Sequence, residues 1–312
     1  MKRTKKSTAR ADAILMADPH IREEVPLCRK DDFWTAQWAK WDFIAKLQRT
    51  HRCPVLCGGD VFDHWRVRPV VLSYALAHLP HWFMTIVGQH DLPYHNFRLL
   101  EYSSMQVLVN AGAAELLTGI GILNWGQDYK REKARVTEYN QCRLQFGKRR
   151  VMVAHRLVYD DKQQPEPFPG AKDSKGTSTA RSMLRAFYPY DLILTGDNHL
   201  PFMTEYKGRL LVNPGSLMRT EIGQRDHVPQ VYLYYANSNE VEAVTIPHDK
   251  EVMDEEKAKE TTKKKENTKV FIRRMGEDSF SREISFRANV YRALENHPPP
   301  KSIRTIILKS LE

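Results

Sequence analysis

The stretch Val55-Leu56-Cys57-Gly58-Gly59-Asp60-Val61-Phe62-Asp63 is the part of the sequence that decides the fold. Its first three residues form an apolar run that is typical of a short buried strand. Gly58 and Gly59 follow, and they permit a tight turn with close approach of the backbone to a ligand. Asp60 then stands at the carboxyl end of the strand, where open α/β sheets bind ligands. Taken by itself, the pattern fits a loop or helix-cap aspartate as well as a ligand.

The same layout, an apolar strand that ends in Asp or His, recurs four more times. The other strand ends carry Asp18-Pro19-His20, Gly88-Gln89-His90-Asp91, His155 and Gly196-Asp197-Asn198-His199. A single histidine is more often a surface or core residue than a ligand, but five such strand ends together indicate one shared site. Carboxylates and imidazoles without thiolates suit Mn, Mg, Fe or Zn. Two ions about 3.5–4 Å apart that share one carboxylate stabilise the attacking and leaving oxygens of a phosphoryl substrate.

These five motifs resemble those of the calcineurin-like binuclear metallophosphoesterases, whose blocks are Asp-x-His, Gly-Asp, Gly-Asn-His-Asp, His and Gly-His-x-His. The resemblance covers about residues 11–220. Within the superfamily the chain is most similar to the SbcD-type nuclease subunit of DNA double-strand-break repair, including its phage versions. That narrower match rests on Gly59-Asp60-Val61-Phe62-Asp63 followed by Arg68-Pro69, and on Asn213-Pro214-Gly215-Ser216-Leu217-Met218-Arg219. The resemblance implies an α/β fold, a four-layer α/β/β/α sandwich of two packed mixed sheets with a small C-terminal helical appendage.

The resemblance also implies roles for individual residues. One metal is expected on Asp18, His20, Asp60 and His199, and the second on Asp60, Gln89, His155 and Asp197, with Asp60 as the bridge. His90 is expected to face the scissile phosphate as a charge stabiliser or general acid. Asp91 either orients His90 or caps the following loop. Asp63, Arg219 and Arg225 are interpreted as substrate-binding residues, against the alternative that they are capping or surface side chains.

Two positions depart from the family pattern, and both fall on the second metal. Gln89 stands where the family has Asn, and Asp197 stands where it has His. The glutamine keeps the amide oxygen but adds a methylene, and the aspartate adds negative charge and makes the site harder. We therefore expect two divalent metal ions, with Mn favoured over Mg, Fe and Zn. A non-catalytic scaffold that has lost its metal chemistry is the alternative.

Composition and charge restrict the partners and the compartment. The 312 residues are 41% apolar and carry a net charge of +10, with a pI of about 9.3. This excess of positive charge favours a polyanion such as DNA as the binding partner, although part of the charge lies in the runs 2–6 and 257–269. The sequence has no apolar run of about 18 residues and no visible signal peptide, so no membrane partner is expected. The four cysteines form no Cys-x-x-Cys pair, which favours a reducing cytoplasm.

The expected organisation has four parts: a basic arm over 1–10, a catalytic domain over 11–248, a charged linker over 249–269 and a helical partner-binding segment over 270–312. By position, the last segment corresponds to the family region that binds the coiled coil of an SbcC-type ATPase, and a homodimer is a further expectation. Within the catalytic domain we expect one amphipathic helix between residues 97 and 111. We also expect several short antiparallel strands of a second sheet over 115–146. The long loop over 160–179 is expected either to border the cleft or to be a plain flexible loop.

The sequence thus predicts a metal-dependent DNA nuclease. Exonuclease activity is the main expectation, and endonuclease activity is a second expectation. The enzyme would hydrolyse phosphodiester bonds with a hydroxide activated by two metals and would work with an SbcC-type ATPase in repair or recombination. Two alternatives stay open: a phosphodiesterase or phosphatase that acts on a nucleotide or another phosphoester, and a nucleic-acid-binding scaffold without catalysis.

Overall fold

The computed structural model describes residues 9–134, 141–161 and 178–254, together with residues 256, 294, 295 and 304. The chain divides into two compact units, Met1–Asp254 and Glu255–Glu312. Among the described residues, no helix combines the length and the apolar character that crossing a membrane requires. Most of the predicted loop 160–179 and nearly all of segment 270–312 lie outside the described residues.

The first sheet has six strands in the order β14-β13-β1-β2-β3-β4. Their bounds are β1 Ala13–Met16, β2 Val55–Cys57, β3 Phe83–Thr85, β4 Glu115–Leu116, β13 Gln230–Tyr235 and β14 Glu240–Thr245. The strands β1 to β4 run parallel, whereas β13 and β14 are antiparallel additions at the β1 edge. Because β1, β2 and β3 are parallel neighbours, the residues that follow them come out at one edge of the sheet.

The second sheet has the order β11-β12-β10-β7-β5, and β6 also pairs with β7. Its strands are β5 Ile122–Leu123, β6 Leu144–Phe146, β7 Arg149–His155, β10 Leu192–Gly196, β11 Phe202–Tyr206 and β12 Arg209–Asn213. The strands β5, β7, β10 and β12 are parallel, and β11 and β6 are antiparallel. A separate pair, β8 Val158–Tyr159 and β9 Ser178–Thr179, follows β7.

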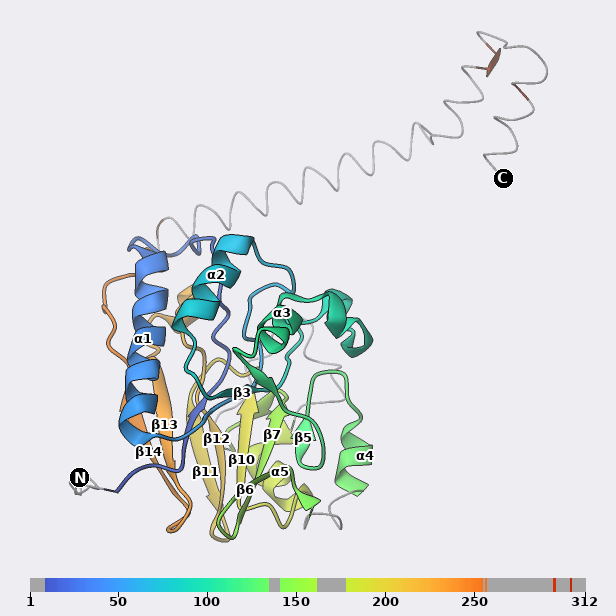
Figure 1. Cartoon of the computed structure of the whole chain (residues 1–312). Helices are drawn as coiled ribbons and strands as arrows, with labels where there is room; N and C mark the ends of the chain where they lie inside the picture. Colours follow the sequence, from blue (N-terminus) through green and yellow to red (C-terminus); the bar gives the residue numbers. More distant parts are fainter. Residues whose placement is uncertain are drawn as a thin grey trace. The chain divides into compact units, whose positions relative to one another are not determined.

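Alternation along the strands builds the layers. In β1, Ile14 and Met16 pack in the core under helix α1, whereas Ala13 and Leu15 face the core between the two sheets. In β10, Leu192 and Leu194 face that same middle core, and Ile193 turns towards α5. Such a period of two, with both faces apolar, is what a strand buried between two layers requires. The predicted four-layer α/β/β/α sandwich is confirmed (Figure 1).

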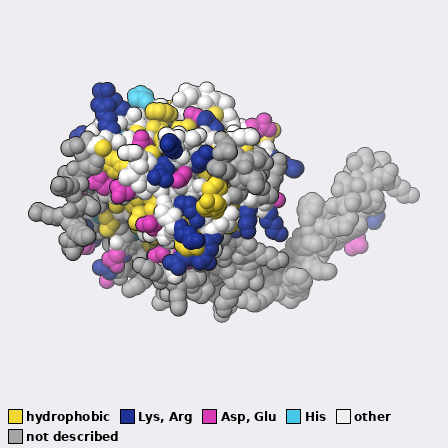
Figure 2. Space-filling model, turned by 90° about the horizontal axis from the view of Figure 1, so that it is seen from below, with side chains coloured by type: hydrophobic (Ala, Val, Ile, Leu, Met, Phe, Trp, Pro, Cys, Tyr) yellow, Lys and Arg dark blue, Asp and Glu magenta, His cyan; other side chains and the backbone are white. Residues whose placement is uncertain are grey.

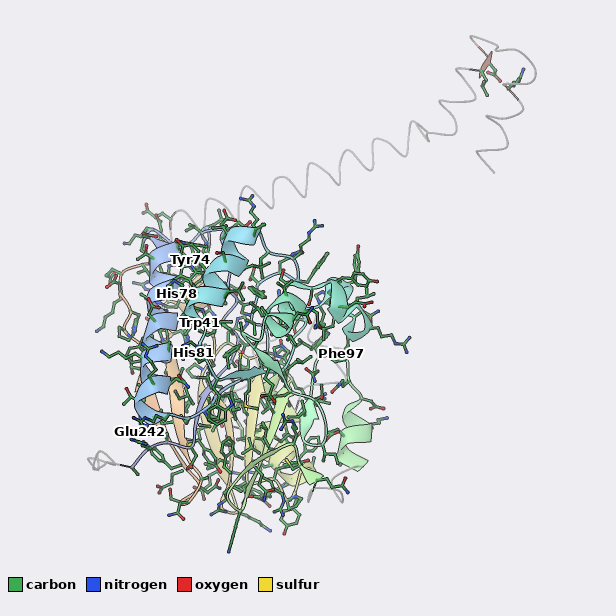
Figure 3. All side chains as sticks on the ribbon, viewed as in Figure 1. Trp41, Tyr74, His78, His81, Phe97 and Glu242 are labelled. Carbon is green, nitrogen blue, oxygen red and sulfur yellow. The ribbon has the colours of Figure 1, made fainter. Side chains whose placement is uncertain are left out.

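Helices α1 Phe33–His51, α2 Pro69–His78 and α3 Ser104–Asn110 contribute to the core on the outer face of the first sheet, and α5 Ala180–Ala186 covers the second. Asp32 caps α1 by accepting a hydrogen bond from the amide of Thr35 at 3.0 Å. Trp38 and Trp41 of α1 are buried. The ring of Trp38 lies 5.5 Å from that of Tyr74 and 5.3 Å from that of His78, and the rings of Tyr74 and His78, labelled in Figure 3 on α2, stack at 5.7 Å.

Two of the predicted elements differ from the structure. The single helix expected between 97 and 111 is a 3-10 helix, η2 Phe97–Tyr102, followed by α3, because Ser103 ends one and caps the next. The prediction of antiparallel strands over 115–146 is wrong for most of that segment. β4 joins the first sheet in parallel, β5 is parallel to β7, and a helix, α4 Tyr129–Ala134, lies between β5 and β6. Among the described residues of this segment, β6 is the one antiparallel strand, since a short strand's pairing depends on long-range neighbours rather than on its own pattern.

Residues 249–254, the first part of the predicted linker, pack on the first unit. The amide of Lys30 donates to the carbonyl of Val252 at 3.0 Å, and that of Asp254 donates to Cys28 at 2.7 Å. Val252 and Cys28 are both buried. Residues 249–254 therefore belong to the first unit, which ends at Asp254.

Candidate metal centre

The five strand ends of the sequence converge at one edge of the sandwich. Ile14–Met16 of β1 pair in parallel register with Val55–Cys57 of β2, and β2 pairs likewise with β3. On the second sheet His155 of β7 lies directly opposite Gly196 of β10. The two sheets meet here, because the Nδ1 atom of His155 donates to the carbonyl of Gly58 at 2.7 Å.

Asp18, His20 and His199 form the first cluster. One ligand atom from each lies within 4.8 Å of the others. The Nε2 atoms of His20 and His199 face each other at 3.1 Å. Two neutral imidazole nitrogens that meet through their lone pairs require a proton or a cation between them. Both side chains are largely buried, so a bound cation fits this cluster.

Asp60, His155, Gln89 and Asp197 form the second cluster. The Nε2 atom of His155 lies 2.8 Å from Oε1 of Gln89 and 3.2 Å from Oδ2 of Asp60. Gln89 in turn donates from Nε2 to Oδ1 of Asp197 at 2.8 Å. Because the Nδ1 atom of His155 is committed to a carbonyl, its Nε2 atom is the one left to bind a metal. The two residues that depart from the family pattern are thus hydrogen-bonded to each other.

The Oδ2 atom of Asp60 joins the two clusters. It lies 3.8 Å from Nε2 of His20 and 3.2 Å from Nε2 of His155. It is buried, and within the described part of the chain it has no hydrogen-bond partner. A buried carboxylate oxygen without a donor costs free energy unless a cation binds it. The residues present therefore fit a pair of divalent ions with Asp60 between them.

The same groups have strongly shifted pKa values. Burial raises the pKa of Asp18 to about 7. Burial also opposes the charged form of Asp60, but His155, His20 and His90 hold its pKa well below the ordinary value. Burial and the neighbouring imidazoles lower the pKa of His199 to about 3, so this side chain is a neutral donor at pH 7. Perturbed values of this kind cluster at functional sites.

Unusual backbone geometry accompanies the ligands. Asp18, His20, Asp60 and Asp197 all have positive φ, between 46° and 76°. This left-handed region is costly for residues with a side chain and persists only where the surroundings enforce it. Gly88 shows how close the packing is: a Cβ atom at this position would lie 2.1 Å from Oδ1 of Asp60. The glycines of the motifs are needed for close approach, as the quoted stretch predicts for Gly58 and Gly59.

His90 lies at the rim of the site. Its ring packs edge-on against His20, with centroids 4.9 Å apart. Its Nδ1 atom donates to the carbonyl of Asp63 at 2.8 Å, and its amide donates to Oδ1 of Asp60 at 2.8 Å. The carboxylate of Asp63 lies 3.5 Å from Nδ1 of His20 and pairs with Arg22. His90 and Asp63 therefore stand beside the first cluster, where the predicted substrate contact would be made.

Asp91 does not orient His90 in the structure. Its carboxylate accepts from the amides of Val61, Phe62 and Gly88 at 3.2, 2.9 and 3.0 Å. It is buried, and burial together with Asp60 raises its pKa to about 7. The alternative interpretation, that Asp91 caps the local loop, is the one that its hydrogen bonds match, because a carbonyl of Asp63 rather than a carboxylate holds the His90 ring.

The two arginines after the Asn-Pro-Gly-Ser motif occupy different environments. Arg219 is buried, and its guanidinium donates to the carbonyls of Arg225, Asp249 and Lys250. These bonds correct the prediction that Arg219 grips the substrate, because the side chain is turned inwards and anchors the end of the first unit. Arg225 is exposed, and its carbonyl is one of the groups to which Arg219 donates.

The sequence interpretation missed residues that follow β5. Asn124 accepts from the amide of Val87 at 2.9 Å, and the ring of Trp125 lies 6.1 Å from that of His155. Both come directly after the carboxyl end of a parallel strand. The rule that found the other strand ends would have found these residues too, had Ile122–Leu123 been recognised as a strand of the parallel set.

A cleft of about 560 Å³ adjoins the site on the His20 side. Arg22, Asp63, His64, Arg66 and Arg68 line it, together with Glu23 and Glu24. The guanidinium of Arg66 packs over the ring of Trp65 at 5.3 Å. The cleft is large enough for a nucleotide-sized group beside the candidate metals.

No protein-family model matches the sequence, and no curated protein matches it either. Solved structures do match by fold. An archaeal phosphodiesterase is 12% identical with a TM-score of 0.40 over 75% of this chain and 99% of its own. A metallophosphoesterase from Sphaerobacter thermophilus is 11% identical, with a TM-score of 0.37 over 76% of this chain and 89% of its own.

A putative 5'-nucleotidase from Staphylococcus aureus is 10% identical, with a TM-score of 0.43 over 79% of this chain and 56% of its own. Identities and scores at this level are too low for an activity to be transferred to this chain. The ligand geometry of the chain itself therefore has to support any functional conclusion.

Proposed function

We propose that the chain is a calcineurin-like phosphodiesterase that depends on divalent metals and cleaves DNA. The observation that supports it best is the orphaned Oδ2 atom of Asp60, flanked by the Nε2 atoms of His20 and His155. A bridging carboxylate with imidazoles on both sides is the arrangement that two-metal phosphoryl-transfer sites use.

The ions would be held by Asp18, His20, Asp60 and His199 on one side, and by Asp60, Gln89, His155 and Asp197 on the other. When bound, such ions polarise the phosphoryl oxygens and lower the pKa of a bound water towards about 7. The negative carboxylates of Asp60 and Asp18 would offset the positive charge of the two ions. With Asp197 in place of a histidine, hard ions such as Mn or Mg are favoured over Zn.

His90 would act on the substrate directly. Its Nδ1 atom is committed to the carbonyl of Asp63, so its Nε2 atom is the one that is left to meet a phosphoryl oxygen. In the protonated state it would stabilise negative charge there or give a proton to the leaving oxygen. Arg22 and Arg66 of the adjoining cleft would contact neighbouring phosphates.

DNA is proposed as the substrate on the net charge of +10 and on the resemblance of the Gly59–Asp63 and Asn213–Arg219 motifs to the SbcD type. The same resemblance, by position only, supports an SbcC-type ATPase as a partner of segment 270–312. Co-purification of such an ATPase with the full chain, and its loss on removal of 270–312, is the measurement for that part.

The variant His90→Ala tests the catalytic proposal. We expect it to bind Mn as the wild type does and to unfold at the same temperature, but to cleave linear DNA at least about 100-fold more slowly, because one acid–base or charge-stabilising group typically contributes that much. Calorimetric Mn titration, thermal unfolding and a DNA cleavage assay measure the three quantities. The exposed His81→Ala is the control and should cleave normally.

Three results would contradict the proposal in different ways. Normal cleavage by His90→Ala would remove its catalytic role. Binding of a single Mn by the wild type would remove the two-metal assignment. Rapid hydrolysis of a cyclic nucleotide or of an aryl phosphodiester, with none of linear DNA, would leave a metallophosphodiesterase whose substrate is another phosphoester.

A further inference from the structure

Four cations surround one tyrosine ring at the end of the second sheet opposite to the metal site. The charged groups of Arg181, Arg185, Lys207 and Arg209 lie 5.9, 5.1, 5.6 and 5.8 Å from the ring centroid of Tyr206. Arg181 and Arg185 come from α5, Lys207 comes from the turn between β11 and β12, and Arg209 is the first residue of β12. We call Arg181, Arg185, Tyr206, Lys207 and Arg209, with Tyr188, the tyrosine patch.

The positive charge of this patch is not balanced within the described residues. None of its four cations forms an ion pair with a described carboxylate there, although Arg149 next to them does so with Asp191. Two acids near α5 are engaged elsewhere: Asp161 accepts from the backbone amide of Arg181, and Asp160 accepts from the hydroxyl of Thr204. Four like charges within about 6 Å of one ring repel each other and together attract an anion.

The patch also offers aromatic faces to solvent. Tyr188 is 64% exposed, and the guanidinium of Arg209 packs over its ring at 5.0 Å. Arg181, Arg185 and Lys207 are exposed, whereas Arg209 is buried and donates to the carbonyl of Leu184. The pKa of Tyr206 is lowered by a hydrogen bond from Arg185 and by the surrounding cations. Arginines interleaved with exposed rings are typical of surfaces that bind single-stranded nucleic acid.

The patch lies at a defined place relative to the metal site. Arg209 comes just before Leu210, which pairs with Leu192 at the amino end of β10, whereas Gly196 at its carboxyl end adjoins the ligands. Five residues of strand separate the two ends, which is about 15 Å at roughly 3.3 Å per residue. Figure 2, a view from below in Figure 1, shows several groups of Lys and Arg side chains on this face, among hydrophobic and acidic ones.

We propose that the tyrosine patch is a second binding surface for the same nucleic acid, which it holds by phosphate pairing and base stacking at a distance from the metals. The inference rests on the proposed function in that it takes DNA as the substrate. A nucleic-acid strand that spans about 15 Å contains roughly 4 nucleotide steps at about 3.4 Å each. Substrates shorter than this reach only one of the two surfaces.

Nucleic acid matches this surface better than an acidic protein or a membrane does. Planar guanidinium groups pair with phosphate oxygens in a bidentate manner and stack on rings. The exposed ring of Tyr188 supplies a face on which a base can stack, at about 1–3 kcal/mol. A membrane surface would also call for exposed apolar side chains that enter the lipid, and the patch consists of arginine, lysine and tyrosine.

The test compares two charge-reversed double variants in metal-free buffer. One is Arg181→Glu with Lys207→Glu in the patch. The matched control is Lys46→Glu with Arg49→Glu, one exposed lysine and one exposed arginine on α1. Fluorescence anisotropy measures the Kd of a labelled 20-nucleotide single strand at several salt concentrations. Thermal unfolding checks that both variants fold.

We expect the patch variant to bind the 20-mer about 10-fold or more weakly than the control, with a salt dependence shallower by about 1.4, or 0.7 for each of two lost phosphate contacts. Tyr188→Ala should weaken binding of the 20-mer about 5-fold, which a purely electrostatic surface would not show. Equal affinity of the two double variants for the 20-mer overturns the inference.

A second assay separates this inference from the proposed function. Hydrolysis of a small aryl phosphodiester with Mn depends on the metal site and should be unchanged in the patch variant. The wild type could hydrolyse no phosphodiester while the patch variant, unlike the control variant, loses DNA affinity. The proposed function would then fail, and the inference that the patch binds nucleic acid would stand. If the wild type is active but both variants bind DNA equally, or if anionic vesicles are bound in place of DNA, the patch fails.

Discussion

At the residue scale, the site depends on how tightly its backbone approaches its side chains. Four of the proposed ligands occupy the left-handed region, and a Cβ atom added at Gly59, Gly88 or Gly196 would lie 2.6, 2.1 or 2.5 Å from a neighbouring atom. The packing of the surrounding sandwich holds the ligands in these unfavourable backbone conformations and keeps their side chains buried. Oδ2 of Asp60 has no hydrogen bond within the described residues and lies 3.2 Å from Nε2 of His155, so a bound cation would add to the stabilisation that this imidazole gives.

Gly88→Ala tests this approach. The new Cβ atom would lie 2.1 Å from Oδ1 of Asp60 and 2.7 Å from Cε1 of His155. Because both neighbours are buried and fixed, we expect a loss of about 1–3 kcal/mol in the free energy of unfolding and at least about a tenfold loss of Mn affinity. Denaturant unfolding and calorimetric titration measure the two effects.

Gly223→Ala is the matched control, because a Cβ atom there meets open space. It should leave Mn binding unchanged and alter the unfolding free energy by less than about 0.5 kcal/mol. A Gly88→Ala variant that binds Mn like this control would show that the loop before His90 adapts, and that the close approach has no role in the site.

At the scale of elements, α1 connects the outer core to the metal edge. One face of the helix buries Trp38, Trp41 and Ile44 in the core. From the same helix Lys40 reaches across and donates to the carbonyl of Leu217 at 2.8 Å. The amide of Leu217 in turn donates to the carbonyl of Asp18 at 3.2 Å. The buried Lys40 of α1 thus holds Leu217, whose backbone in turn supports the metal ligand Asp18.

Lys40 gives this connection a pH dependence. Burial and the charges of Arg29 and Arg219 lower the pKa of Lys40 from 10.5 to about 7. Below pH 7 it is charged in both states, so the cost of burying the charge is fully present. Between pH 7 and 10.5 the unfolded chain binds a proton that the folded protein does not, and stability therefore rises with pH.

We expect the wild type to gain stability relative to Lys40→Met as the pH rises from 6 to 10. The gain in unfolding free energy is on the order of 3–4 kcal/mol, at about 1.4 kcal/mol per pKa unit. Urea unfolding at a series of pH values measures this difference. Lys46→Met, at an exposed position of the same helix, should show no such trend. A constant difference for Lys40→Met would mean that the lysine stays charged when folded.

At the scale of the whole molecule, metal binding and folding are coupled. The ligands come from both sheets, so the site exists only when the sandwich is assembled. A ligand that binds the folded chain alone stabilises it by about 2.7 kcal/mol at a concentration of 100 Kd. Removing metals should therefore lower the unfolding temperature of the first unit.

We expect Mn at millimolar concentration to raise the unfolding temperature by several degrees over that in EDTA, and Asp60→Asn to lose most of this rise because it weakens both ion positions at once. Scanning calorimetry with and without Mn measures the shift. Equal unfolding temperatures of the wild type in Mn and EDTA would count against a metal site shared by the two sheets.

Much of the fold could be predicted because strand, turn and cap signals are local. The apolar runs before Asp18, Asp60 and His155 are strands, and the hairpin of β11 and β12 turns at Lys207-Gly208 as its turn residues indicate. The segment 115–146 could not be predicted in the same way. Its two-residue strands have no pattern of their own, and their partners, β3 and β7, lie elsewhere in the chain.

The sequence by itself determined which residue types stand at the ends of the parallel strands, because backbone alternation and glycine turns are properties of neighbouring residues. Only the tertiary structure decided which of them work together. It brought Asp60 between two histidines from different sheets, turned Asp91 to the backbone and Arg219 to the interior, and gathered four cations around Tyr206. Those outcomes depend on burial and on contacts between segments far apart in the chain, which no local pattern records.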